Sequence, residues 1–246
     1  MTYAERPAAR DGVVLWRSVS EAAQPSLILP DGCLDLLWDG SRLIVAGPDT
    51  VARTHVPGAL PEDAPVAPSA PVPLGATRFT ALRFGAATGP AALGVAASDV
   101  VDRLVPLEDL WGTRRTRELA ERVAAAETRT RGGAAHALES WLRSAPEPAD
   151  PLGRRVFGMA RAGVPVAEMA DRAGFSARQL QRRSQELFGY GAGHLLRVLR
   201  LQRALARARA GVPLARAAAD AGYCDQAHLS RETKSLTGTT PRTLLS

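Results

Sequence analysis

Hydrophobic positions in the first part of the chain form short runs separated by turn residues, a pattern typical of β-strands. Short apolar runs occupy residues 13–19, 27–29, 34–38 and 42–46. Asp39-Gly40 separates the last two runs and favours a tight hairpin, because glycine accepts a positive φ without steric cost. Residues 77–84 alternate, with Phe79, Ala81 and Arg83 on one side of the predicted strand. This part of the chain is therefore predicted to be rich in β-structure.

From Gly89 the hydrophobic spacing changes to the period of helices. The pattern predicts helices at residues 90–95, 100–110, 114–126 and 133–143, and only helices after residue 151. Prolines punctuate residues 145–151, which predicts a linker, and the prolines between residues 57 and 73 predict an exposed extended loop. We expect an α+β chain with a β-rich domain in 1–112, a helical connector and proline-rich linker in 113–151, and an all-α domain in 152–246.

The predicted all-α part contains an internal repeat. Residues 164–175 read VPVAEMADRAGF and align with residues 212–223, VPLARAAADAGY, at an offset of 48 residues. Beyond this stretch the offset becomes 49, so that Leu180 matches Leu229 and Gly189 matches Gly238. Self-similarity of this kind indicates two copies of one supersecondary unit.

Each copy has the layout of a helix-turn-helix. Proline suits the first turn of a helix, and Gly174 or Gly222 can adopt the left-handed conformation that ends it. Ser176 and Asp225 are suitable caps for the helix that follows. The outer face of that helix carries Arg178, Gln179, Gln181 and Arg182 in the first copy, and Gln226, Ala227, Ser230 and Arg231 in the second. These residues are the predicted base readers, because Arg pairs with guanine and Gln with adenine in the major groove.

Charge is distributed unevenly along the chain. The net charge is +6, but residues 152–246 have a balance of +10 and residues 1–151 a balance of −4. A basic module on a mildly acidic body favours a polyanionic partner such as nucleic acid, although solvated helix faces are the alternative. The residues expected to contact DNA phosphates are Ser176, Arg197, Arg200 and Arg242, with Arg154, Arg155, Arg203 and Arg207 as further candidates.

Residues 155–246 resemble the DNA-binding region of AraC-type transcription regulators, in which a long helix joins two helix-turn-helix units. Residues 194–206, HLLRVLRLQRALA, are similar to the connecting helix of that family, and residues 222–241 carry its second-unit signature. The resemblance implies a sequence-specific transcription regulator acting on double-stranded DNA in the cytoplasm, at the nucleoid. Homodimerisation and contact with RNA polymerase are further expectations. Ser184 and Thr233 stand where the family usually has phenylalanine, so Phe188 or leucines of the connecting helix are expected to fill the core.

The N-terminal segment is similar to the domain of a subset of actinobacterial AraC-like regulators. The matching motifs are LPDGCLDL at 29–36, VAGPDT at 45–50, LRF at 82–84 and LEDLWG at 107–112. Such a domain commonly binds a small-molecule effector, mediates dimerisation, or does both. The residues expected to line an effector pocket are Trp16, Trp38, Phe79, Phe84 and Trp111, with core packing as their alternative role. Asp31 is expected in a turn, and Asp35 is expected to cap or to face outward.

Catalytic and metal-binding patterns are not recognised in the sequence. Cys33 and Cys224 cannot build a disulfide framework or a four-thiolate zinc site, and Cys224 and His228 lack a third ligand. No nucleophile triad or glycine-rich phosphate loop is present. We therefore expect no enzymatic activity, no cofactor and no metal. The alternatives are a DNA-binding protein with little sequence preference and, more remotely, a DNA-modifying enzyme with an AraC-like domain. No uninterrupted apolar stretch approaches 18 residues, so no membrane partner is expected.

Overall fold

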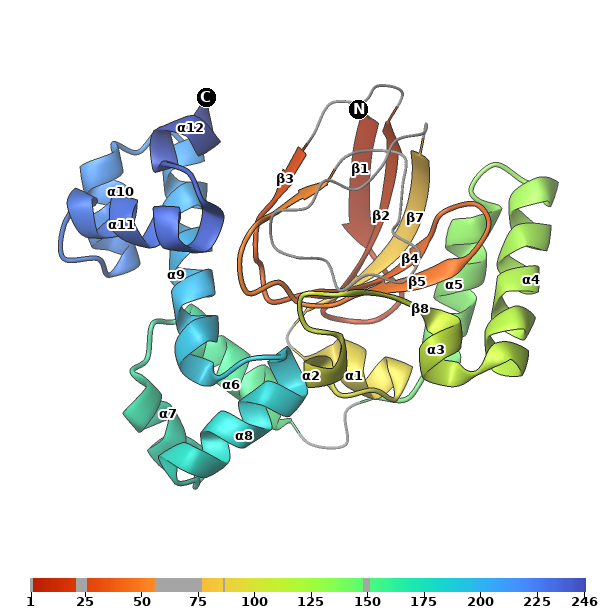
Figure 1. Ribbon diagram of the computed structural model, residues 1–246, viewed down its shortest axis with the longest axis horizontal. Helices are drawn as coiled ribbons and strands as arrows, with labels where there is room; N and C mark the ends of the chain where they lie inside the picture. The colour runs from red at the N-terminus through yellow and green to blue at the C-terminus, as the bar shows by residue number, and fades with distance from the viewer. Residues whose placement is uncertain (1, 21–25, 56–76, 86, 148–150) are drawn as a thin grey trace.

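A six-stranded antiparallel sheet organises the N-terminal part of the chain (Figure 1). The structure is a computed structural model, and it describes residues 2–20, 26–55, 77–85, 87–147 and 151–246. The spatial order of the strands is β1-β2-β7-β4-β5-β8, and β3 pairs with β6 in a second, small sheet. Their bounds are β1 (Thr2–Pro7), β2 (Val13–Ser20), β3 (Ser26–Ile28), β4 (Leu34–Trp38), β5 (Leu43–Ala46), β6 (Arg53–His55), β7 (Thr77–Phe84) and β8 (Leu104–Pro106).

Strand alternation gives the large sheet two different faces. On β4, Leu34, Leu36 and Trp38 are buried in the main core, whereas Asp35 and Leu37 point to the opposite side. Helices α4 (Thr113–Arg129) and α5 (Gly133–Ser144) cover the apolar face (Figure 1). Their leucines share one core with the strands, together with Val123 and Trp141. The helices expected as a connector thus pack onto the sheet.

Three short helices and one edge strand connect the sheet to α4. The helices are α1 (Thr88–Leu93), α2 (Ala97–Val100) and α3 (Leu107–Trp111). The helix predicted over 100–110 is wrong in its middle, because residues 104–106 form β8 and Val105 pairs with Val45 of β5. The hydrophobic run there suits a buried strand and a helix equally, and pairing with β5 decides between them.

The C-terminal part is helical throughout its described residues, as predicted. Its helices are α6 (Leu152–Arg161), α7 (Val166–Ala173), α8 (Ala177–Phe188), α9 (Ala192–Arg209), α10 (Leu214–Ala221), α11 (Gln226–Thr237) and α12 (Pro241–Leu245). Two cores form, one around α6–α8 and one around α10–α12. Helix α9 joins them, with Leu195 and Leu199 in the first core and Leu201 and Leu205 in the second.

Local signals for the helix ends are confirmed. Gly174 and Gly222 have φ values of +73° and +87°, and each ends the first helix of its unit. Ser176 caps α8 and Asp225 caps α11 through their side-chain oxygens. The proline-rich loop predicted between residues 57 and 73 lies outside the described residues. Within the described part of the chain, no helix combines the length and apolarity needed to cross a membrane.

Candidate nucleic-acid interface and cavity

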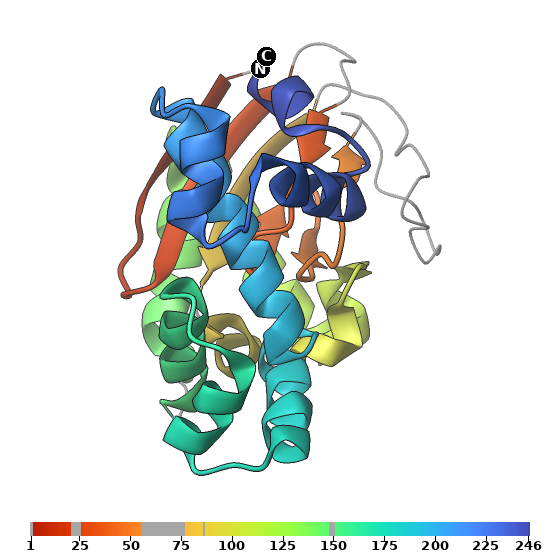
Figure 2. The ribbon, with the colours of Figure 1, turned by 90° about the vertical axis from the view of Figure 1, so that its left-hand side faces the viewer.

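The outer faces of α8 and α11 are open to solvent. Helix α8 lies at the N-terminal end of α9, and α11 packs against its C-terminal half (Figure 1 and Figure 2). The exposed predicted readers are Arg178, Gln179, Gln181, Arg182, Gln226, Ala227 and Arg231. Ser230 is half-buried, and its hydroxyl donates to the Gln226 carbonyl oxygen at 2.9 Å. The arrangement presents two polar helix faces from one chain.

Two of the predicted DNA-contacting residues also have a structural role at the start of α8. The Ser176 hydroxyl accepts from the Gln179 backbone N–H at 3.3 Å, and Oε1 of Gln179 accepts from the Ser176 backbone N–H at 2.8 Å. This reciprocal capping box satisfies two N–H groups that a helix start leaves unpaired. While it caps the helix, Gln179 has only Nε2 free to donate to a base, so bidentate pairing with adenine requires its amide to leave the cap.

The arginines of α9 take part in contacts inside the C-terminal region. Arg197 and Arg200 both pair with Glu232 of α11, with N···O distances of 3.4 and 2.7 Å, and Arg200 also lies over the Tyr223 ring at 4.5 Å. Arg203 donates to backbone carbonyls of Ala160, Arg161 and Ala221, which joins α6 to α10. The side chain of Arg200 is only 20% exposed and shares Glu232 with Arg197, so the phosphate contact expected of Arg200 stays a prediction and would compete with this ion pair. Arg242 is exposed, as are Arg154, Arg155 and Arg207, and Arg207 also pairs with Asp220.

The two positions without phenylalanine are buried. Ser184 and Thr233 are 1% and 0% exposed, and the Thr233 hydroxyl donates to the Leu229 carbonyl oxygen at 2.8 Å. Phe188 fills the core of the first unit together with Leu195, one of the leucines of α9. The expected compensation by Phe188 and by connecting-helix leucines is confirmed in this unit.

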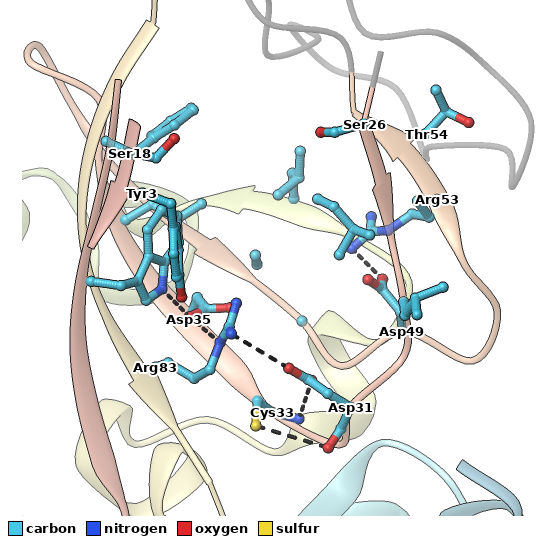
Figure 3. A pocket seen from close by; sticks show the side chains of 18 residues that line it. Tyr3, Ser18, Ser26, Asp31, Cys33, Asp35, Asp49, Arg53, Thr54 and Arg83 are labelled. Atoms are coloured by element: carbon cyan, nitrogen blue, oxygen red, sulfur yellow. Dashed lines mark hydrogen bonds and ion pairs between the residues drawn. The ribbon is translucent and has the colours of Figure 1, made fainter. Parts of the chain in front are cut away.

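A cavity of about 230 Å³ lies between the second face of the large sheet and the β3–β6 pair (Figure 3). Residues of the large sheet form one wall, and residues of β3, β6 and the loops next to them form the other. The lining residues are Tyr3, Trp16, Ser18, Ser26, Ile28, Leu29, Asp31, Cys33, Asp35, Leu37, Ala46, Gly47, Asp49, Arg53, Thr54, Phe79, Arg83 and Leu104.

The structure divides the five aromatic residues expected in a pocket. Trp16 and Phe79 line the cavity, with ring centroids 6.4 Å apart. Trp38 and Phe84 lie in the core beneath α4 and α5, and Trp111 packs against that core. Their pocket role is corrected, because alternation along β4 and β7 turns Trp38 and Phe84 to the helical face.

Polar groups in the cavity form two clusters. Asp35 points into the cavity rather than outward, and its Oδ1 accepts from Trp16 Nε1 at 2.8 Å and from Arg83 Nε at 3.2 Å. Arg83 also lies 3.7 Å from Asp31, and on the facing wall Arg53 pairs with Asp49 (Figure 3). Sequence reasoning missed Arg83, although Asp35 and Arg83 are directly opposed in the β4–β7 register. The available signal for this pair was a charged residue inside each of two largely apolar strands, Asp35 in β4 and Arg83 in β7.

Burial shifts the acid–base behaviour of the cavity groups. It raises the pKa of Asp35 despite the opposing effect of Arg83, and it raises the pKa of Asp49 to about 7. Burial also raises the pKa of the Cys33 thiol well above its usual range. Cys224 is an exposed free thiol. Among the described residues, no three His, Cys, Asp or Glu side chains are grouped as ligands of a metal ion.

Comparison with known proteins bears on the C-terminal region. A family model described as a helix-turn-helix domain matches residues 169–246. Residues 169–246 form a helix-turn-helix domain. The match begins near the middle of α7 and ends with the last residue of the chain. A comparison with curated proteins found no match.

Solved structures of ToxT from Vibrio cholerae are similar to the whole chain at low identity. The structure from strain O395 is 9% identical, covers 96% of this chain and 98% of its own, and has a TM-score of 0.46. The complex with (E)-4-(8-methylnaphthalen-1-yl)but-3-enoic acid is 10% identical, with coverages of 94% and 98% and a TM-score of 0.47. The wild-type protein with bound unsaturated fatty acid is 9% identical, with coverages of 98% and 96% and a TM-score of 0.44. Similarity of this degree assigns neither a ligand nor a function to the chain.

The C-terminal helices and the β-rich domain are in direct contact at α9 and α11. Nε2 of Gln202 donates to the Pro30 carbonyl oxygen at 2.6 Å, and Nε2 of His194 lies 2.9 Å from the Thr50 carbonyl oxygen. The Ala52 backbone N–H donates to the carbonyl oxygen of Leu236 at 2.7 Å. These three contacts use the segments before β4 and before β6, which also contribute lining residues to the cavity.

Proposed function

We propose that the protein is a sequence-specific, double-stranded DNA-binding transcription regulator of the AraC type, controlled by a small molecule in the N-terminal cavity. The observation that carries the proposal is the pair of open reader helices, α8 and α11, at the two ends of α9. Helix-turn-helix units present the second helix to the major groove, and its N-terminal side chains contact base edges. Two such helices from one chain suit two successive major grooves on one face of the duplex.

Charge supports DNA as the partner. The region from residue 152 to the end has a balance of +10, and Arg178, Arg182 and Arg231 are exposed on the reader faces. Exposed arginines next to glutamines can both neutralise phosphates and read bases. A protein that only coats DNA needs the first property, so a test must separate binding from sequence preference.

Contacts of the cavity walls support control by a ligand. The segment around Leu29 and Asp31 lines the cavity, and Pro30 within it accepts from Gln202 of α9. The segment from Gly47 to Arg53 also lines the cavity, and Thr50 within it contacts His194 of α9. A ligand that moves either segment acts directly on the helix that spaces the two readers. The ligand would change DNA binding if it bound more tightly to the protein with α9 in one position than in another.

Selection of bound sequences from a random duplex pool, with the full chain, tests the proposal. We expect a bipartite motif whose two halves are centred about one helical turn, roughly 34 Å, apart. The selected duplex should then resist competition by excess unrelated duplex at about 0.15 M salt, where non-specific binding is weak. Enrichment of no motif, or equal competition by unrelated DNA, would contradict a sequence-specific regulator and favour a low-specificity binder. A motif recovered as a repeat would indicate a homodimer.

A further inference from the structure

The described lining of the cavity contains more acidic than basic side chains. Among the residues that the structure describes there, Asp31, Asp35 and Asp49 are acidic, and Arg53 and Arg83 are basic. Both guanidinium groups are engaged, since Arg83 lies 3.2 Å from Asp35 and 3.7 Å from Asp31, and Arg53 pairs with Asp49. With these five groups ionised, the described lining carries one negative charge in excess. Removing a charge from water without full compensation is unfavourable, so the site favours an added cation.

The protonation behaviour of the carboxyl groups agrees with this shortage of positive charge. Asp35 accepts hydrogen bonds from Trp16 and Arg83, both of which lower its pKa, yet burial dominates and the pKa is raised. Burial likewise outweighs the effect of Arg53 at Asp49. A ligand cation would favour the ionised form of both groups.

Aromatic rings form the apolar part of the same cavity. The centroid of Trp16 lies 6.4 Å from that of Phe79 and 6.0 Å from that of Tyr3. Arg83 Cζ already lies 5.7 Å from the Trp16 ring, within the range of a cation–π contact. The faces of such rings attract cations and also bury a flat apolar group.

The size of the cavity limits the ligand. Its volume is about 230 Å³. Drug-sized ligands occupy sites of roughly 300–1,000 Å³, so this site lies below that range. A ligand of about ten non-hydrogen atoms is therefore the appropriate class.

We propose that the cavity binds a small organic monocation, an arylalkyl ammonium ion whose ring lies against Trp16 and Phe79 and whose ammonium group lies in the polar part of the cavity, which Asp31, Asp35 and Asp49 line. This names the ligand class of the proposed effector site, and its regulatory meaning rests on the proposed function. A carboxylate ligand of the same size would add a second negative charge in excess, and both arginines of the described lining are already paired with aspartates.

Calorimetric titration of the full chain with three probes of matched size tests the proposal. The probes are 2-phenylethylammonium, 2-phenylethanol and phenylacetate, at neutral pH and about 0.15 M salt. We expect the ammonium ion to bind at least about tenfold more tightly than the alcohol, and phenylacetate to bind more weakly than both. Equal affinities, a preference for phenylacetate, or no binding of the ammonium ion at millimolar concentration would each overturn the proposal.

Charge-removing variants locate the binding site. Asp31→Asn removes one negative charge. It keeps a side-chain oxygen to accept the hydrogen bond that the Cys33 backbone N–H donates to Asp31 at 2.9 Å. It should lower affinity for the ammonium ion at least about tenfold and leave the alcohol unaffected. Asp49→Asn is a second variant on the facing wall with the same expectation. Glu118→Gln, which removes an exposed charge on α4, is the matched control and should change nothing. Unchanged ammonium affinity in both cavity variants, each shown to be folded by its melting curve, would place binding elsewhere.

A DNA measurement separates the two proposals. If no probe binds while the protein still recognises the selected duplex, the proposed ligand class is wrong and the proposal of a DNA-binding regulator is retained. If the ammonium ion binds at the cavity but no sequence is enriched from the duplex pool, the proposed regulator is wrong and the ligand site stands.

Discussion

The Thr50 carbonyl oxygen accepts a hydrogen bond from Nε2 of His194 at 2.9 Å, across the boundary between the β-rich domain and α9. Asp102 fixes Thr50 on the other side, because its carboxylate accepts from both the Thr50 backbone N–H and the Thr50 hydroxyl at 2.7 Å. Thr50 directly follows Asp49, which lines the cavity. The contact therefore joins a cavity wall to the connecting helix through a single rigid residue.

Acid should weaken the fold through His194. Burial lowers the pKa of His194 from its ordinary value of 6.5, with the Arg197 charge acting in the same direction. The unfolded chain then binds more protons than the folded chain just below pH 6.5, so stability falls as the pH falls through that range. The free energy of unfolding, measured by denaturant titration at several pH values, should decrease more on acidification in the wild type than in His194→Gln.

The glutamine variant keeps a hydrogen-bond donor for Thr50 and removes the titrating group. Every other acid and base is common to the two proteins, so the difference between their pH profiles isolates His194. Identical profiles between about pH 7.5 and 5.5 would show that this histidine titrates alike in the folded and unfolded chains.

Glu232 should be important for the stability of the second unit. Its side chain is 9% exposed and pairs with both Arg197 and Arg200 of α9. Glu232→Gln leaves two arginines facing a neutral group, and breaking a largely buried pair in this way should cost about 2–4 kcal/mol in unfolding free energy. Thermal or denaturant unfolding measures the loss.

Glu168→Gln is the matched control for that substitution. Glu168 pairs with Arg172 one helical turn away, and both side chains are about half exposed. Exposed pairs at this spacing contribute roughly 0.3–0.5 kcal/mol, so the control should unfold almost like the wild type. Similar losses of unfolding free energy in Glu232→Gln and Glu168→Gln would mean that burial of Glu232 does not increase the stability that its ion pairs contribute.

The helical half was predictable because its signals are local. Gly174 and Gly222 end helices through their own backbone freedom, and Ser176 and Asp225 cap helices through residues three positions away. The internal repeat independently predicted the same helix-turn-helix arrangement. Each of these signals acts within a few residues of the chain.

The cavity could be predicted only in part because it depends on pairing between distant strands. Alternation in residues 77–84 correctly placed Phe79 and Arg83 on one side, yet it could not say which side faces the helices. Asp35 meets Arg83 only through the β4–β7 register, which joins residues 48 positions apart. The contacts of the α9 arginines were even harder to predict, because Glu232 reaches Arg200 only once α11 has packed against α9.

Two glycines should respond in opposite directions to alanine. A Cβ on Gly47 would lie 1.6 Å from the Val100 carbonyl oxygen, a backbone atom that cannot move alone, whereas a Cβ on Gly158 in α6 would meet nothing within 4 Å. Gly47→Ala should therefore lower the unfolding free energy by more than about 3 kcal/mol. Gly158→Ala should raise it by about 0.5–1 kcal/mol, since alanine favours helix. Melting curves of the two variants show whether each substitution raises or lowers stability. If Gly47→Ala is as stable as the wild type, residues 47 and 100 do not approach closely in solution.

Arg182 and Arg231 should each set specificity at one end of the DNA site. Both are exposed on the reader faces, Arg182 on α8 and Arg231 on α11. An arginine that forks to guanine discriminates by about 1–3 kcal/mol, so Arg182→Ala and Arg231→Ala should each lose roughly 5- to 150-fold in affinity for the selected duplex. Each variant should also accept any base pair at one position, in a different half of the motif. Titration of base-substituted duplexes at fixed salt measures this.

Arg117→Ala is the control for the loss of a positive charge. Arg117 is exposed on α4, a helix that packs on the sheet outside the C-terminal helices. Its removal should leave both affinity and base preference unchanged. If Arg182→Ala and Arg231→Ala instead weaken all duplexes equally, with a shallower dependence on salt, the two arginines contact phosphates. Relaxation at the same position in both variants would contradict the assignment of one reader helix to each half of the site, because α8 and α11 occupy opposite ends of α9.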